Sequence, residues 1–166
     1  MTRSHGNEAP GAERVLRRVL VATDGSATSS GAERAGIDLA ALSGASLIVL
    51  SVIDPSRLRL PGGLFHTRVD QVRVERERVL GRIVANARHR GVAAQFLIWE
   101  GDPGEGVIEA AGAEDADVIV VGSHARRAVG RLLLGSVSSY VVSHSSARVL
   151  VIRPGQELVD VWPEAA

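Results

Sequence analysis

The sequence predicts an α/β protein: a five-stranded parallel sheet in the order 3-2-1-4-5, with helices on both faces in a Rossmann-like arrangement. Strand-like and helix-like segments alternate five times along the chain. The strand-like segments are short, continuous runs of Val, Ile and Leu, which is typical of parallel strands buried on both faces. Right-handed crossovers through the helices would connect them. A length of 166 residues suits one domain with a sizeable core.

The first third of the chain predicts two strands around one helix. Residues 17–24 (RRVLVATD) form the first expected strand, and the turn residues GSATSS follow it. A helix is expected over 29–43, where Gly44 ends it, and a second strand over 46–54. A loop is expected over 55–66. The apolar residues at helical spacing in the first helix are Ala32, Ala35, Leu39 and Leu42.

The rest of the chain continues the alternation. A long helix over 67–90 presents one apolar stripe, and Pro103 fits the first turn of a shorter helix over 104–113. The stripe consists of Val69, Val72, Val79, Ile83 and Ala87. The last helix and the three remaining strands are expected at 135–146 and at 92–102, 117–122 and 147–154, respectively.

Composition excludes several classes of function. The 19 basic and 19 acidic residues cancel, so no overall field favours a nucleic acid or membrane partner. The absence of cysteine excludes disulfides and thiolate zinc sites, and no other metal site is indicated. All basic residues are arginine, which excludes a Walker A loop and Schiff-base chemistry. Any bound anion must therefore be held by guanidinium groups, hydroxyls or backbone amides.

The ends of the chain suggest a single domain with two flanking segments. Residues 1–14 are polar and contain Gly and Pro without an apolar signal core, so we expect a disordered lead-in to a cytoplasmic protein. No apolar run approaches the roughly 18 residues of a membrane span. The domain is expected over 15–154, followed by a C-terminal tail over 155–166.

Polar residues gather where the predicted topology places a ligand crevice. Open α/β sheets bind ligands outside the carboxyl ends of the strands, where the strand order reverses. In the order 3-2-1-4-5 this point lies between the first strand, ending at Asp24, and the fourth, ending at Gly122. Gly135-Ser136 opens the last helix, whose free amides and dipole favour an anion. Arg126 and Arg131 lie between these glycines and add positive charge, so the segment suits a phosphate chain.

Three segments carry a resemblance to the universal stress protein family: VLVATDGS, LSVID and VIVVGSHARRAVGRLLLGSVSSYVVSHSSARVLVIR. The resemblance covers about residues 15–154 and implies the same parallel α/β fold. Many members bind ATP through a pattern of Gly, two residues, Gly, nine residues, and Gly followed by Ser or Thr. Gly122 and Gly135-Ser136 match this pattern, whereas Ala125 replaces the middle glycine. The resemblance therefore implies ATP binding, weakened by the departure at Ala125.

Carried over by position, the resemblance assigns each end of the nucleotide to residues of this chain. Asp24 would contact the adenosine end with Ala22 as its backbone neighbour, and the main chain of Val52 would read the adenine edge. Magnesium would bind through the phosphates, since no carboxylate cage is indicated. The residues expected at ribose and phosphates are Gly122, Ser123, Ala125, Gly135, Ser136, Val137 and Ser138.

Simpler interpretations stay open beside this one. Asp24-Gly25-Ser26 also fits a turn with a helix cap, and the loop arginines also fit a solvated surface. The alternatives to a regulatory ATP-binding protein are a nucleotide-free dimeric scaffold and a slow ATP hydrolase. No catalytic residue is assigned, because Ser136 has no histidine base partner in the sequence. The edge strand over 147–153 predicts a homodimer, as family members commonly pair there.

Overall fold

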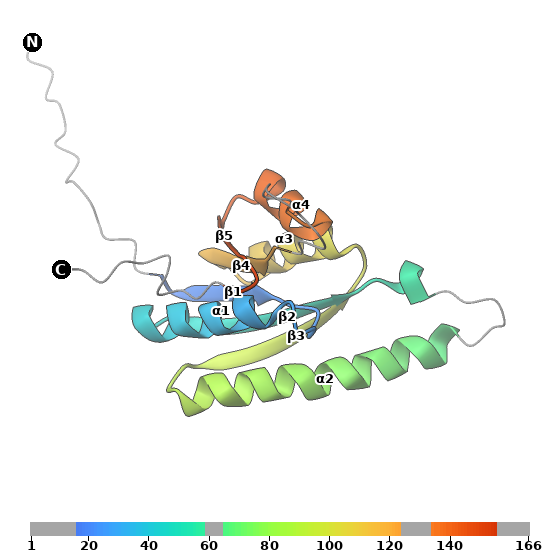
Figure 1. Cartoon of the computed structure of the whole chain (residues 1–166), viewed down its shortest axis with the longest axis horizontal. Coiled ribbons are helices and arrows are strands. Elements are labelled where there is room, and N and C mark those ends of the chain that lie inside the picture. Colours follow the sequence, from blue (N-terminus) through green and yellow to red (C-terminus); the bar gives the residue numbers. More distant parts are fainter. Residues whose placement is uncertain (1–15, 59–64, 124–133, 156–166) are drawn as a thin grey trace, which may run out of the picture.

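The computed structural model describes residues 16–58, 65–123 and 134–155, with only the backbone described at 65–67. Its strands form one parallel sheet in the order β3-β2-β1-β4-β5, which confirms the expected fold class (Figure 1). The strands are β1 (Arg18–Ala22), β2 (Ser46–Ile53), β3 (Ala94–Glu100), β4 (Val118–Gly122) and β5 (Arg148–Ile152). The helices are α1 (Ser30–Ser43), α2 (Phe65–His89), α3 (Pro103–Ala113) and α4 (Ser136–His144), with a 3-10 turn η1 (Pro55–Leu58) after β2.

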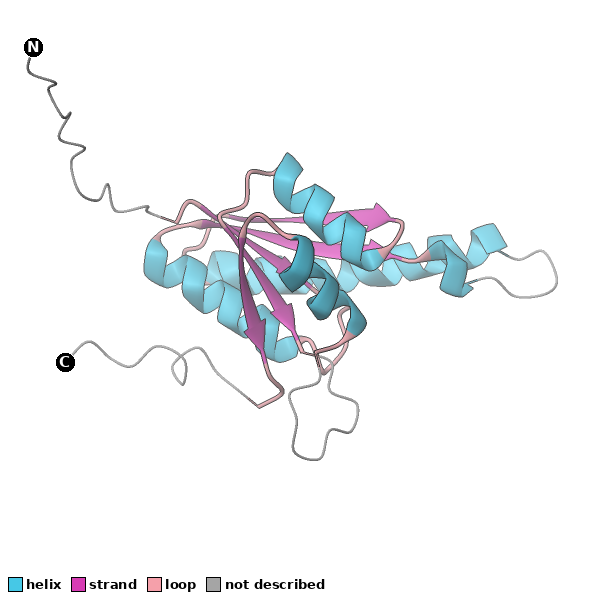
Figure 2. Ribbon diagram, turned by 90° about the horizontal axis from the view of Figure 1, so that it is seen from above, coloured by secondary structure: helices cyan, strands magenta, loops and turns pink. Residues whose placement is uncertain are grey.

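Helices cover both faces of the sheet (Figure 2). Because successive strand residues point to opposite faces, Val19 and Val21 of β1 pack into the core beneath α1 and α2. Leu20 packs into the second core, beneath α3 and α4. Burial on both faces explains why the strands are continuous apolar runs. In the described ranges, no helix combines the length and the apolar character needed to cross a bilayer.

Helix α1 lies unusually close to β1 because its middle residue is Gly36. A Cβ atom built on Gly36 would be 1.9 Å from Cγ2 of Val21, which is fully buried. The helix ends at Gly44, whose φ of 70° is the left-handed conformation that favours glycine. Gly36 thus allows α1 to pack close to the sheet, and Gly44 determines where the helix ends.

Hydrogen bonds join the central strands at the end of the sheet where β1 begins. Arg18 opposes Ser46 on β2, and Val19 opposes Val118 on β4. The Asp117 carboxylate, just before β4, accepts hydrogen bonds from the backbone amides of Arg17 and Arg18 at 2.8 and 3.0 Å. These amide hydrogen bonds hold the pKa of Asp117 below its ordinary value.

The structure differs from the expected elements mainly at their ends. The expected loop over 55–66 contains η1, and α2 begins at Phe65 rather than at residue 67. Strand β1 ends at Ala22, two residues before the expected end, although the amide of Thr23 still donates a 2.9 Å hydrogen bond to the carbonyl of Leu50 on β2. Leu42, expected on the packed face of α1, is 79% exposed. The buried face of α1 is centred instead on small residues such as Gly36, away from Leu42.

Candidate functional site

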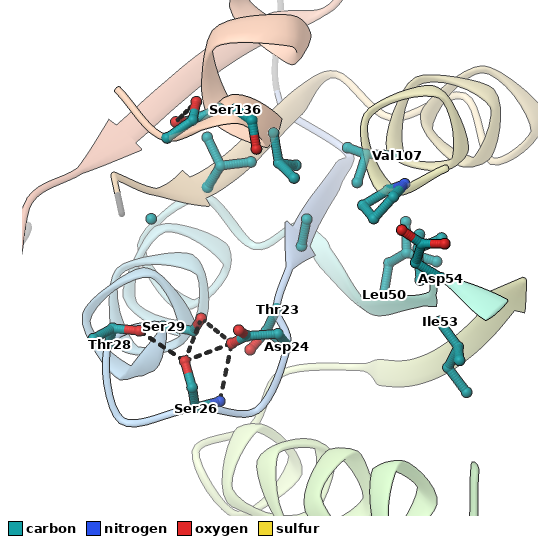
Figure 3. A pocket seen from close by; sticks show the side chains of 18 of the residues that line it. Thr23, Asp24, Ser26, Thr28, Ser29, Leu50, Ile53, Asp54, Val107 and Ser136 are labelled. Atoms are coloured by element: carbon teal, nitrogen blue, oxygen red, sulfur yellow. Dashed lines mark hydrogen bonds between the residues drawn. The ribbon is translucent and has the colours of Figure 1, made fainter. Parts of the chain in front are cut away.

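A cavity of about 780 Å³ opens at the carboxyl ends of β1, β2 and β4. Helix α4 and the start of α3 border it on one face of the sheet, and α2 borders it on the other (Figure 3). Residues of η1, which contacts α2, also line it. The volume lies in the range of small-molecule sites, which is about 300–1,000 Å³. The strand order reverses between β1 and β4, so the cavity lies at the topological switch point.

The structure brings the expected site residues together. Every one that lies among the described residues lines this one cavity. Ala125, Arg126 and Arg131 lie outside the described residues. The lining residues that were expected are Ala22, Asp24, Val52, Gly122, Ser123, Gly135, Ser136, Val137 and Ser138.

Asp24 is the centre of a hydrogen-bonded turn at the end of β1 (Figure 3). Its Oδ1 accepts hydrogen bonds from the backbone amide of Ser26 at 3.0 Å and from the hydroxyls of Ser26 and Ser29 at 2.6 Å each. Ser29 is buried just before α1, whereas Asp24 is exposed. The capping turn weighed in the sequence is therefore present, and it fixes the carboxylate at the cavity wall.

A second carboxylate lies behind this turn. Glu33 in the first turn of α1 accepts a 2.6 Å hydrogen bond from the hydroxyl of Thr23, which is itself buried. Burial raises the pKa of Glu33, the hydrogen bond from Thr23 lowers it, and the negative charge of Asp24 raises it further. The net direction is upward, so the protonated form of Glu33 is favoured relative to a free side chain.

The start of α4 presents backbone amides to the cavity. Gly135 is the N-cap residue with φ −65° and ψ 165°, and no side chain caps the helix. The first intrahelical hydrogen bond runs from the amide of Ser139 to the carbonyl of Gly135 at 2.9 Å. The amides of residues 136–138 therefore have no acceptor within the helix, and such amides at a helix start suit an anion.

The two serines of this turn differ in their surroundings. Ser138 is buried, and its hydroxyl donates a 3.0 Å hydrogen bond back to the carbonyl of Gly135. Ser136 is exposed, so its hydroxyl is the one that can reach a bound ligand. Ser138 thus shapes the turn, and an anion would be held by amides and by Ser136.

Two cations that the sequence reasoning missed line the cavity. Arg57 on η1 forms a 3.0 Å ion pair with Asp54, whose pKa is held low mainly by a hydrogen bond from the Ser56 hydroxyl. Arg76 reaches the cavity from α2. Arg57 follows the carboxyl end of β2, so the strand-end rule could have found it. No sequence signal marks Arg76, because its position depends on how α2 packs.

The donors around the cavity fit a phosphorylated ligand better than a bare metal ion. Within the described ranges, no cluster of three or more His, Asp or Glu side chains could hold a metal. Amides at a helix start, serine hydroxyls and guanidinium groups all donate hydrogen bonds to oxyanions. Fold and cavity together define a Rossmann-like α/β protein with a candidate ligand site at its switch point.

Comparison with known proteins identifies the family. The chain belongs to the universal stress protein family, whose model matches residues 16–153. A universal stress protein of Thermus aquaticus is 33% identical over 141 residues, covering 84% of this chain and all of the relative. A universal stress protein crystallised with cAMP is 26% identical, with a TM-score of 0.64, over 85% of this chain and 99% of its own.

A more distant structure agrees in fold. The universal stress protein of Archaeoglobus fulgidus in complex with dAMP is 24% identical with a TM-score of 0.61, over 83% of this chain and 98% of its own. Structural neighbours of this chain thus bind adenine nucleotides.

Proposed function

We propose that this protein binds ATP in the switch-point cavity and acts as a regulatory protein whose state depends on nucleotide occupancy. The observation that carries the proposal is the convergence of the β1 and β4 ends and the start of α4 on one cavity of about 780 Å³. The cAMP complex of a relative supports the choice of an adenine nucleotide.

Each part of the nucleotide has a matching wall. The adenine would lie against Val52. Helix α3 packs closely on Val52 through Gly106, where a Cβ atom would be 3.0 Å from Cγ1 of Val52. The ribose would lie between Asp24 and Gly122. The phosphates would meet the amides at the start of α4, where the helix dipole stabilises negative charge. Magnesium would be held by the phosphates.

The experiment is calorimetric titration of the full chain with ATP and magnesium, comparing the natural protein with Gly135→Asp. Asp is a favourable N-cap residue, and the Gly135 φ of −65° is accessible to it, so the fold should persist. The new carboxylate faces the phosphates, and like-charge contact costs several kcal/mol, so affinity should fall roughly 100-fold.

The matched control is Gly81→Asp, which adds the same charge on α2 where a Cβ meets no atom within 4 Å. Its affinity should equal that of the natural protein. Absence of heat with ATP at millimolar concentration would overturn the proposal and favour the nucleotide-free scaffold. If Ala125→Gly alone creates binding, the departure from the family pattern is the cause.

We propose further that the chain forms a homodimer through the β5 edge. The amide of Ser123 donates to the carbonyl of Ile152 at 2.8 Å, so Ile152 faces β4. Because backbone groups alternate in direction along a parallel strand, those of Val149 and Val151 face away from β4. A second copy pairing along this edge would satisfy them.

A further inference from the structure

Arg76 projects from α2 over the turn that follows β1. Its Nη1 lies 3.1 Å from the position that a Cβ on Gly25 would occupy, and Gly25 has a φ of +69°. Arg76 also lines the cavity. A guanidinium group therefore lies beside the Asp24-Gly25 wall, on the α2 face of the sheet.

This guanidinium lacks a counterion in the described part of the chain. Three arginines of α2 and its C-terminal turn are ion-paired: Arg73 with Glu100, Arg78 with Glu75 and Arg90 with Asp38. Among the described residues, neither an ion pair nor a hydrogen bond is made by Arg76, although its side chain is half-buried. A half-buried cation at a cavity wall without a partner favours an anionic ligand there.

The hydroxyls next to Arg76 are engaged within the turn, where the Ser26 hydroxyl donates to Oδ1 of Asp24. The hydroxyls of Ser26 and Thr28 lie 2.8 Å apart and both residues line the cavity. The Oδ1 atom of Asp24 already accepts three hydrogen bonds, which stabilise its charge within the turn. The wall thus combines a carboxylate fixed within the turn with the guanidinium of Arg76, which is the donor that a ligand can use.

The cavity therefore has two places for an anion, on opposite faces of the sheet. The start of α4 lies on one face and α2, which carries Arg76, on the other, with the ends of the central strands between the two helices (Figure 3). With the 5′-phosphates at α4 and the ribose near Asp24, as proposed above, the 2′- and 3′-oxygens of the ribose would face the wall that carries Arg76. An arginine beside the ribose accommodates a 2′-phosphate in dinucleotide-binding folds of the same general architecture.

We propose that the ligand site selects adenine nucleotides that carry a second phosphate on the 2′- or 3′-oxygen of the ribose, and that Arg76 binds this phosphate. The inference rests on the proposed nucleotide site and specifies its ligand class. A guanidinium fork donates two parallel hydrogen bonds to a phosphate, a geometry that the ammonium of lysine cannot match.

The test is calorimetric competition on the full chain between adenosine 5′-monophosphate and adenosine 3′,5′-bisphosphate, repeated with the 2′,5′-isomer. The natural protein should bind at least one bisphosphate about 10-fold more tightly than the monophosphate. Arg76→Gln should remove this preference, so that the monophosphate and the bisphosphates bind to the variant with equal affinity. Arg76→Lys should retain part of the preference because it keeps the charge.

The matched control is Arg82→Gln, which removes an exposed cation from the same helix outside the cavity and should keep the full preference. Equal affinity of the natural protein for monophosphate and bisphosphates, or a preference that survives in Arg76→Gln, would overturn this inference alone. Failure of every adenine nucleotide, ATP included, to bind would overturn the proposed function together with it. Unchanged melting temperatures exclude unfolding as the cause of a loss.

Discussion

The contact between α1 and β1 makes a sharp prediction for one added methyl group. Gly36→Ala places a Cβ 1.9 Å from Cγ2 of Val21, far inside any real contact distance. Val21 is fully buried beneath α1 and has β2 and β4 as neighbours, so it has little room to move. The helix must therefore lift from the sheet, or Val21 must adopt a strained rotamer.

The magnitude follows from two opposing effects. Overpacking in a rigid core costs about 3 kcal/mol. Replacing glycine by alanine inside a helix recovers about 1 kcal/mol through higher helix propensity. The free energy of unfolding should therefore fall by about 2 kcal/mol, and the melting temperature by about 4–8 °C for a chain of this size.

The matched substitution should change the free energy of unfolding in the opposite direction. Gly81→Ala adds the same methyl group inside α2, where no atom lies within 4 Å. Its free energy of unfolding should rise by about 1 kcal/mol. Urea denaturation followed by circular dichroism measures both changes.

A double variant tests the cause. In Val21→Ala the clashing methyl groups are absent, so adding Gly36→Ala should cost nothing further. A Gly36→Ala protein as stable as the natural one, or a cost that persists beside Val21→Ala, would refute the reasoning from this contact.

Two further predictions concern the turn behind the cavity and the β5 edge. Burial raises the pKa of Glu33 above its ordinary value of 4.5, so the native state binds more protons than the unfolded chain in the range just above that value. The stability of Glu33→Gln relative to the natural protein should therefore increase as pH rises from about 4 to about 7, measured by urea denaturation at each pH; a flat difference would contradict it. In the proposed dimer, the amides of Val149 and Val151 should exchange hydrogen slowly by NMR, with a dimeric mass in sedimentation, whereas a monomer with fast exchange at both would contradict edge pairing.

The strands of the sheet could be predicted from the sequence because each strand leaves a local pattern and the pattern recurs along the chain. Buried parallel strands appear as continuous aliphatic runs, and the switch-point rule then placed Asp24 and Gly122 at one cavity. The exposure of Leu42 could not be predicted, because helical spacing shows which residues share a face but not which face contacts the sheet. The close approach of Gly36 to Val21 places the small residues of α1 against the sheet instead.

The cations of the site show where sequence reasoning ends. The sequence predicts Arg126 and Arg131 as the cations of the site, because they lie between two motif glycines, but both lie outside the described residues. Arg76 was one of several charged residues of a long helix, and only the packing of α2 over Gly25 distinguishes it. Such long-range placement of one long side chain has no periodic signature in the chain.

The fastening of β1 by Asp117 has a practical consequence for assay design. The described chain enters the sheet at Arg17 and Arg18, on the side remote from the ligand cavity, and leaves it at Pro154, which lines that cavity. A label or immobilising group joined ahead of β1 is thus introduced away from the cavity. One joined directly after β5 is introduced beside Pro154, a residue of the cavity wall, so the position ahead of β1 is preferable in a binding assay.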